Sequence, residues 1–151
     1  KLATNNLLDY FKSKNIDLSR IIFAKRENLY EDHLARYTKG DLLLDTFIYN
    51  GHTTTIEALW SGLPVITLEG NSFASRVSAS ILKSIGLDEL ISSSKEEYTE
   101  KVIFYLKNKS ELSKLKLKLK NLKKDKKLFN TKEFVRNYEN ILKKLNTNAN
   151  Y

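Results

Sequence analysis

The stretch "DLLLDTFIYNGHTTTIEALWSGLPVITLEG", residues 41–70, decides the fold. It opens on an apolar run at 41–47 of the kind that a buried parallel strand uses. The threonines that follow favour a helix start, because their hydroxyls can accept from the free N–H groups of a first turn. Gly62 and Pro64 then end the helix, and a second strand is expected over 64–70. The stretch is therefore predicted to form one strand–helix–strand unit.

The alternation of short apolar runs and amphipathic segments continues on both sides of this unit. It indicates a parallel α/β sheet with right-handed crossovers. Ligands of such sheets bind beyond the carboxyl ends of the strands, in loops such as "FIYNGH" at 47–52. We expect a further strand at 20–23, a short apolar segment at 89–92, and helices at 4–14, 28–38, 75–86 with Gly86 as its C-cap, and 94–108 with a Ser94–Glu97 capping box.

The positive charge is concentrated in one segment near the C-terminus. Of the formal net charge of +8, residues 109–127 contribute nine Lys against two Asp or Glu, whereas 1–108 hold 13 basic and 14 acidic residues. Such a segment can attract acidic partners, but we favour a solvated helix face. Leu112, Leu115, Leu119 and Leu122 lie at helical spacing, so we predict a helix there despite the alternation of Lys and Leu, and a last amphipathic helix over 131–145.

Composition narrows the possible functions and locations. The chain has no cysteine, which excludes disulfides and cysteine–metal sites and leads us to expect a cytoplasmic protein. No apolar run approaches the roughly 20 residues that span a bilayer, so no membrane association is expected. The two histidines, His33 and His52, lack the spacing of a zinc site. The chain begins at Lys1, and we expect it to be a piece of a longer protein.

The helix that follows "NGH" allows two interpretations. Its first turn would present free N–H groups and a positive dipole, which suit a phosphate-bearing ligand. Thr54 and Glu57 also fit a T-x-x-E capping box, in which both side chains bond to backbone N–H groups. His33 and Arg36 likewise fit an ordinary helix surface beside Asp32. The pattern by itself leaves these alternatives open.

Five segments follow one another along the chain: "HLARY" (33–37), "LDTFIYNGHTT" (44–54), "ALWSGLPVIT" (58–67), "SFASRVSAS" (72–80) and "LFNTKEF" (128–134). In this order they closely resemble the catalytic C-terminal region of the protein O-linked N-acetylglucosamine transferases, which are GT-B glycosyltransferases. The resemblance implies a nucleotide-sugar donor, normally UDP-N-acetylglucosamine, bound by the second Rossmann-like lobe. Residues 1–108 would be a partial lobe and 109–151 helices that pack on it.

The same resemblance implies a role for each donor-binding residue. His33 would lie against the uracil ring, and Arg36 would bond to its edge. His52, Thr53 and Thr54 would face the diphosphate, with Gly51 allowing close backbone approach. Glu57 would bind the ribose hydroxyls. Fixed N–H dipoles would stabilise the leaving UDP, so no metal is expected. No catalytic residue is expected in this chain. The implied residues are His33, Arg36, Gly51, His52, Thr53, Thr54 and Glu57.

Some positions depart from the family pattern, and other functions remain as alternatives. Tyr30 stands where animal members of the family have a lysine. His52 is retained, whereas the plant O-fucosyltransferases change this part of the motif. The retained histidine favours UDP-N-acetylglucosamine over GDP-fucose as the donor. A GDP-fucose donor is the first alternative, and a basic nucleic-acid-binding module ranks below it. The family places the first lobe and the repeats that recruit acceptor proteins before Lys1. The apolar faces of the last two helices, partly unsheltered here, would allow self-association.

Overall fold

The computed structural model describes residues 2–124 and 130–147, and the chain divides into two compact units, residues 1–33 and 34–151. The first unit holds α1 (Leu2–Ser13) and the 3-10 turn η1 (Leu18–Arg20), and the boundary falls within α2 (Tyr30–Tyr37). The second unit holds β1 (Leu43–Leu44), α3 (Thr53–Trp60), β2 (Val65–Leu68), α4 (Val77–Ser84), η2 (Asp88–Leu90), β3 (Ile91–Ser92), α5 (Lys95–Lys107), α6 (Lys109–Lys124) and α7 (Thr131–Thr147).

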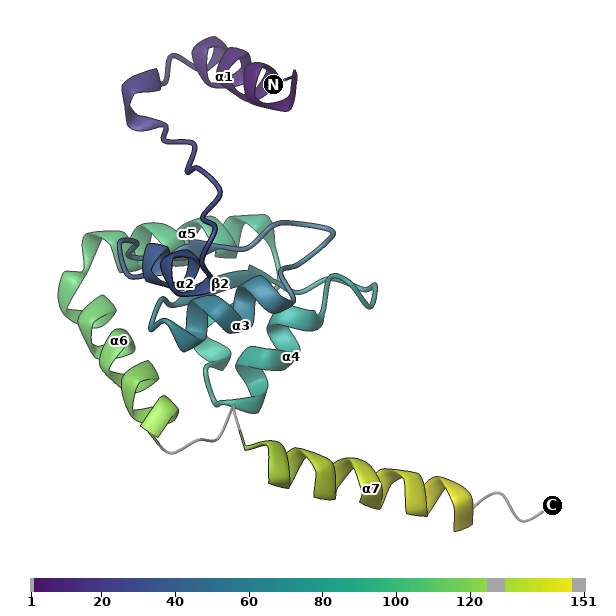
Figure 1. Cartoon of the computed structure of the whole chain (residues 1–151). Coiled ribbons are helices and arrows are strands. Elements are labelled where there is room, and N and C mark those ends of the chain that lie inside the picture. Colours follow the sequence, from purple (N-terminus) through teal and green to yellow (C-terminus); the bar gives the residue numbers. More distant parts are fainter. Residues whose placement is uncertain (1, 125–129, 148–151) are drawn as a thin grey trace. The chain divides into compact units, whose positions relative to one another are not determined.

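A parallel sheet of three short strands organises the second unit. Its order is β1-β2-β3, with Leu43 opposite Val65 and Thr67 opposite Ile91. In Figure 1, β2 lies between α5 on one side and α3 with α4 on the other. Since helices cover both faces, β2 is buried without alternation, and Val65, Ile66 and Thr67 are each 0% exposed. The predicted α/β class with a parallel sheet is confirmed.

Helix α6 packs on the sheet lobe through the predicted leucine stripe. Leu112, Leu115 and Leu119 are buried, and the last two belong to the main hydrophobic core. Leu117, which lies off the stripe, is 58% exposed. The prediction of a helix over the Lys/Leu alternation is confirmed, because a strand would have placed Leu115, Leu117 and Leu119 on one face.

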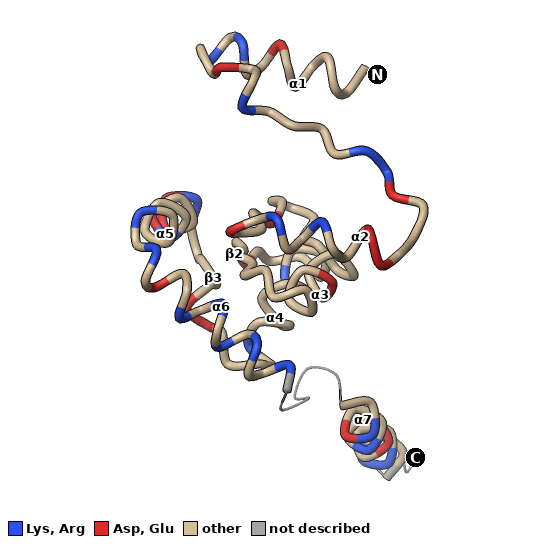
Figure 2. Tube along the Cα trace, turned by 60° about the vertical axis from the view of Figure 1, so that its left-hand side comes forward, with Lys and Arg blue, Asp and Glu red and all other residues tan. Residues whose placement is uncertain are grey.

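Lysines recur along α6, as the blue segments of its tube in Figure 2 show, and several pair with the lobe. Lys116 contacts Asp41 at 2.8 Å and Lys118 contacts Glu89 at 2.7 Å. The Nζ atom of Lys123 lies 3.9 Å from the centre of the Trp60 ring. Part of the basic segment therefore serves to dock α6 on its own domain.

The prediction of a strand at 20–23 is wrong. Arg20 belongs to η1, whose cap Asp17 accepts bonds from the N–H and hydroxyl of Ser19. Ile22 is 87% exposed, and no strand of the described sheet pairs with this segment. An apolar run becomes a strand only where a neighbour takes its backbone hydrogen bonds, and the run itself does not reveal that neighbour.

Two glycines end helices in the left-handed conformation. Gly62 follows α3 with φ +83° and Gly86 follows α4 with φ +67°. After each, the next residue donates its N–H to a carbonyl five residues back, from Leu63 to Ala58 and from Leu87 to Leu82. The predicted helix ends are confirmed.

The start of α5 confirms half of the predicted capping box. The Ser94 hydroxyl accepts from the Glu97 N–H at 3.1 Å. The Glu97 carboxylate, however, accepts from the N–H of Ser93 at 2.7 Å, one residue before the expected partner, and also pairs with Lys101 at 2.9 Å. The N–H bond of Ser93 and the Lys101 ammonium together lower the pKa of Glu97 to about 2.

This shifted carboxylate predicts an acid sensitivity of folding. Because the pKa of Glu97 is lower in the folded than in the unfolded state, its carboxylate stabilises the fold at pH values above the pKa of the unfolded state. This contribution is lost as the pH falls toward 2. We expect the Glu97→Gln variant to lose less of its unfolding free energy than the wild type between about pH 5 and pH 2. Urea unfolding at a series of pH values measures this difference, and parallel curves for the two proteins would contradict it.

The last described helix matches its predicted range. α7 covers Thr131–Thr147, and its apolar side chains are exposed. Among the described residues, no helix combines the length and apolarity that crossing a bilayer requires. The exposed apolar residues of α7 are Phe134, Val135, Tyr138, Ile141, Leu142 and Leu145.

Candidate functional site

Helix α3 begins at the carboxyl edge of the sheet, one loop after β1. Its N-cap is His52, whose side chain makes no capping hydrogen bond. Thr53 and Thr54 are exposed, and the backbone N–H groups of these three residues donate to no described residue. The first turn therefore offers unused donors at the positive end of the helix dipole.

The capping box proposed for Thr54 and Glu57 is not adopted. Because the helix starts at Thr53, Thr54 is its second residue and not its cap. The Glu57 side chain is buried and accepts a bond from the Tyr37 hydroxyl at 3.3 Å. The structure therefore excludes the capping-box interpretation of this helix start. The hydrogen bond from Tyr37 to Glu57 connects α2 to α3 instead.

Gly51 sits where any side chain would collide with its neighbours. A Cβ there would lie 2.6 Å from the hydroxyl oxygens of Thr54 and Thr55. The Gly51 carbonyl accepts from the hydroxyls of Thr55 and Ser78, both at 2.9 Å, and its N–H donates to Asp45 at 2.7 Å. Both backbone groups of Gly51 are therefore used, which fixes the loop before α3.

Asp45 is the residue of this site that the sequence analysis did not identify. Its buried carboxylate accepts from the N–H groups of Gly51 and Thr46 through Oδ1, and from the Thr67 hydroxyl at 2.7 Å through Oδ2. The Tyr98 hydroxyl donates to the Asp45 carbonyl at 3.1 Å. Burial, and then the charge of Asp45, raise the pKa of Tyr98 to about 12, so this donor stays protonated. The available signal was a carboxylate within the apolar run predicted as a strand at 41–47.

The His52 ring is held between two exposed aromatic side chains. It stacks on Tyr49, with 5.1 Å between ring centres and 12° between planes, and meets the edge of Phe73 at 6.1 Å. Its Nε2 atom is buried and has no hydrogen-bond partner among the described residues. The ring is thus oriented by packing while one nitrogen remains available.

The other two predicted residues lie on α2, three positions apart. His33 is half-buried and stacks on Tyr30, with 6.2 Å between the ring centres, and Arg36 is half-buried one turn later. Arg36 shares the second unit with α3, whereas His33 closes the first unit. The second unit brings Gly51, His52, Thr53, Thr54 and Glu57 together on one loop and helix, and does not include His33.

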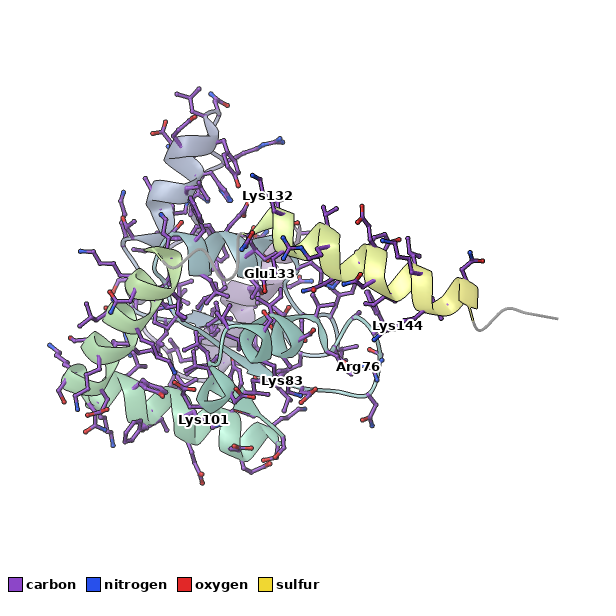
Figure 3. The ribbon with its side chains drawn as sticks, turned by 90° about the horizontal axis from the view of Figure 1, so that it is seen from below. Arg76, Lys83, Lys101, Lys132, Glu133 and Lys144 are labelled. Atoms are coloured by element: carbon purple, nitrogen blue, oxygen red, sulfur yellow. The ribbon has the colours of Figure 1, made fainter. Side chains whose placement is uncertain are left out.

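A pocket of about 460 Å³ opens at the same edge of the sheet. It is lined by Phe47 and Ile48 after β1, by residues 68–72 and Ser75 after β2, and by 93–95 after β3. At its side, Lys83 of α4, labelled in Figure 3, donates to both carboxylate oxygens of Glu69 at 2.8 and 2.9 Å. The three strand-to-helix loops therefore surround one hollow, as expected for a ligand-binding edge.

Ile48, on the rim of this pocket, has an unfavourable backbone conformation. Its φ is +72°, a region that costs an L-residue about 1–2 kcal/mol, and its side chain is 86% exposed. Asparagine tolerates this region and would lose little burial, so Ile48→Asn is expected to raise the unfolding free energy by about 1 kcal/mol. Denaturant titration of both proteins measures the change, and a less stable variant would contradict it.

Among residues 2–124 and 130–147, no group of three or more His, Cys, Asp and Glu side chains is arranged to hold a metal ion. The polar groups of the site are backbone N–H donors, hydroxyls, one imidazole and the buried carboxylates of Asp45 and Glu57, on α3 and the loop before it. Such a set suits an anionic ligand at the helix start and hydroxyl groups beside the Glu57 carboxylate.

Comparison with known proteins gives one consistent result. The family model described as glycosyl transferase family 41 matches residues 2–138. A tomato protein named as a probable UDP-N-acetylglucosamine–peptide N-acetylglucosaminyltransferase SPINDLY is 37% identical over 78% of the chain. The UDP-N-acetylglucosamine–peptide N-acetylglucosaminyltransferase of Caenorhabditis elegans is 32% identical over 88% of it.

A solved structure extends the similarity to the fold. The K341M mutant of the Thermobaculum terrenum O-GlcNAc transferase matches 95% of this chain, with a TM-score of 0.88 and 29% identity, and the match covers 27% of that protein. The chain spans only 13% and 12% of the tomato and nematode relatives.

Proposed function

The chain belongs to glycosyl transferase family 41, and we propose that it supplies the donor-binding part of an enzyme that transfers N-acetylglucosamine from UDP to protein Ser or Thr hydroxyls. The reaction is a direct displacement with inversion at the sugar. The fold is the predicted Rossmann-like lobe of a GT-B glycosyltransferase, as the match to the bacterial O-GlcNAc transferase confirms. The catalytic groups come from parts of the complete protein outside this chain.

The start of α3 is the observation that carries the proposal. Its unused N–H groups and the exposed residues Thr53 and Thr54 suit the diphosphate, and the missing side chain of Gly51 leaves room for the Thr54 hydroxyl. The leaving UDP gains negative charge in the transition state, and donors already in place stabilise it without reorganising. Transfer therefore proceeds without a metal ion, and we expect activity to survive EDTA.

The remaining predicted residues bind the nucleoside. The Glu57 carboxylate accepts hydrogen bonds from the ribose hydroxyls. This role is supported by its burial and by the hydrogen bond from Tyr37, which holds the carboxylate in one orientation. His33 packs against the uracil ring while Arg36 bonds to its edge. The stacking of Tyr30 on His33 supports a ring-binding surface on α2. Tyr30 is the aromatic residue that stands where animal members have a lysine.

Partners and location follow from the family. Acceptor proteins bind regions of the complete protein that this chain does not contain, and the enzyme works in the cytoplasm. The exposed apolar side chains of α7 provide a surface for self-association. A nucleic-acid partner is less well supported, because Lys116 and Lys118 pair with acidic residues of the chain itself.

The donor is tested by offering the complete protein UDP-N-acetylglucosamine and GDP-fucose in parallel, each labelled in the sugar, with and without EDTA. We expect label to pass to protein from UDP-N-acetylglucosamine only, and equally in both buffers. Transfer from GDP-fucose alone would show that the donor is GDP-fucose, as in the plant O-fucosyltransferases. Loss of transfer in EDTA that Mg²⁺ restores would contradict the metal-independent reaction.

A further inference from the structure

We propose that Asp45 is a positioning residue that sets the diphosphate-binding loop by hydrogen bonds to its backbone. The proposal rests on the proposed function and adds a residue to it. Asp45 does not belong to the first turn of α3, yet it joins the loop before that turn to the central strand. We infer that the loop binds UDP well only while these bonds hold it in place.

The two carboxylate oxygens of Asp45 have separate partners. Oδ1 accepts from the Gly51 N–H at 2.7 Å and from the Thr46 N–H at 3.0 Å, both in the loop. Oδ2 accepts from the hydroxyl of Thr67, which lies in β2. One side chain therefore fastens the loop to the most buried strand of the sheet, and the Tyr98 bond to the Asp45 carbonyl fixes its backbone as well.

This fastening determines where the donors of α3 point. With the Gly51 N–H taken by Asp45 and its carbonyl taken by Thr55 and Ser78, the peptide groups that follow have one orientation. The next N–H groups, from His52 onward, are the unused ones that would meet the diphosphate. Donors held in advance stabilise charge better than donors that must be ordered on binding.

The required property of Asp45 is its hydrogen-bonding geometry and not its charge. A negative charge beneath an anion-binding loop opposes the ligand, so the carboxylate is useful only through the oxygens it presents. Asparagine can keep the Oδ1 bonds and donate from Nδ2 to the Thr67 hydroxyl, which can also accept. Alanine removes all these bonds, and glutamate keeps the charge but displaces the oxygens by one methylene.

The variants Asp45→Ala, Asp45→Glu, Asp45→Asn and Thr67→Val of the complete protein are compared by calorimetric titration with UDP and by kinetics, with Asp45→Asn as the matched control that keeps the hydrogen bonds. We expect alanine and glutamate to weaken UDP binding about tenfold or more and to lower kcat. Asparagine is expected to bind UDP within about threefold of the wild type. Thr67→Val, which removes the bond that joins Asp45 to β2, is expected to weaken UDP binding in the same direction as alanine.

The outcome separates positioning from simple stabilisation. Folded alanine or glutamate variants that bind UDP like the wild type would overturn the proposal, and so would an asparagine variant as impaired as glutamate. If alanine does not fold, the contrast between glutamate and asparagine decides. A wild-type protein that does not bind UDP would instead refute the proposed function, whereas silent Asp45 variants beside a wild type that binds UDP refute only this inference.

Discussion

The Thr54→Ala variant of the complete protein is expected to transfer N-acetylglucosamine about 10²-fold more slowly than the wild type. Thr54 is an exposed residue at the second position of α3, beside N–H groups that no described residue uses. It would stabilise the charge that develops on the leaving UDP, so the loss should appear in kcat more than in KM. His52→Ala is expected to act in the same direction.

Steady-state kinetics over a range of UDP-N-acetylglucosamine concentrations measures this effect. Thr99→Ala is a matched control, because Thr99 is an exposed threonine on α5 whose hydroxyl bonds only to its own helix, at the Lys95 carbonyl. Its turnover should equal that of the wild type. If Thr54→Ala and His52→Ala both turn over normally, the assignment of the diphosphate to this helix start is wrong.

The second large effect concerns the packing of α6. Leu119 is 3% exposed within the main core, so Leu119→Ala is expected to lower the unfolding free energy by about 2–5 kcal/mol. Leu117, two residues earlier on the same helix, is 58% exposed, and Leu117→Ala is expected to change it by no more than about 0.5 kcal/mol. Urea unfolding of this chain and of the two variants gives both values.

This pair of variants tests the helix as well as its packing. In a strand, Leu117 and Leu119 would lie on the same face, and the two substitutions would cost similar amounts. On the helix described here they lie on different faces. Equal losses would therefore contradict both the helical assignment and the docking of α6 on the sheet.

The sequence predicted most elements because their signals are local. Helix ends at Gly62 and Gly86, and the leucine stripe of α6, depend on residues within one or two turns of one another. The strand expected at 20–23 failed for the opposite reason, since pairing depends on a neighbour that the apolar run does not specify.

The site was predictable only in part, for the same physical reason. Resemblance to a family indicated that residues 51–57 bind a ligand, but their local pattern also fitted a helix cap. The observed start of α3 at Thr53 excludes that cap. Asp45 escaped notice because its partners Thr67 and Tyr98 lie 22 and 53 positions away. The left-handed backbone of Ile48 follows from the path of the loop and contradicts the preference of its side chain.

Hydrogen–deuterium exchange of the complete protein, with and without saturating UDP, tests the central claim most directly. The N–H groups at the start of α3 are predicted to be the donors to the diphosphate, so peptides covering residues 51–57 should exchange more slowly with UDP. GDP at the same concentration should protect them less. Calorimetric evidence that UDP is bound, with unchanged exchange over 51–57, would show that the diphosphate lies elsewhere.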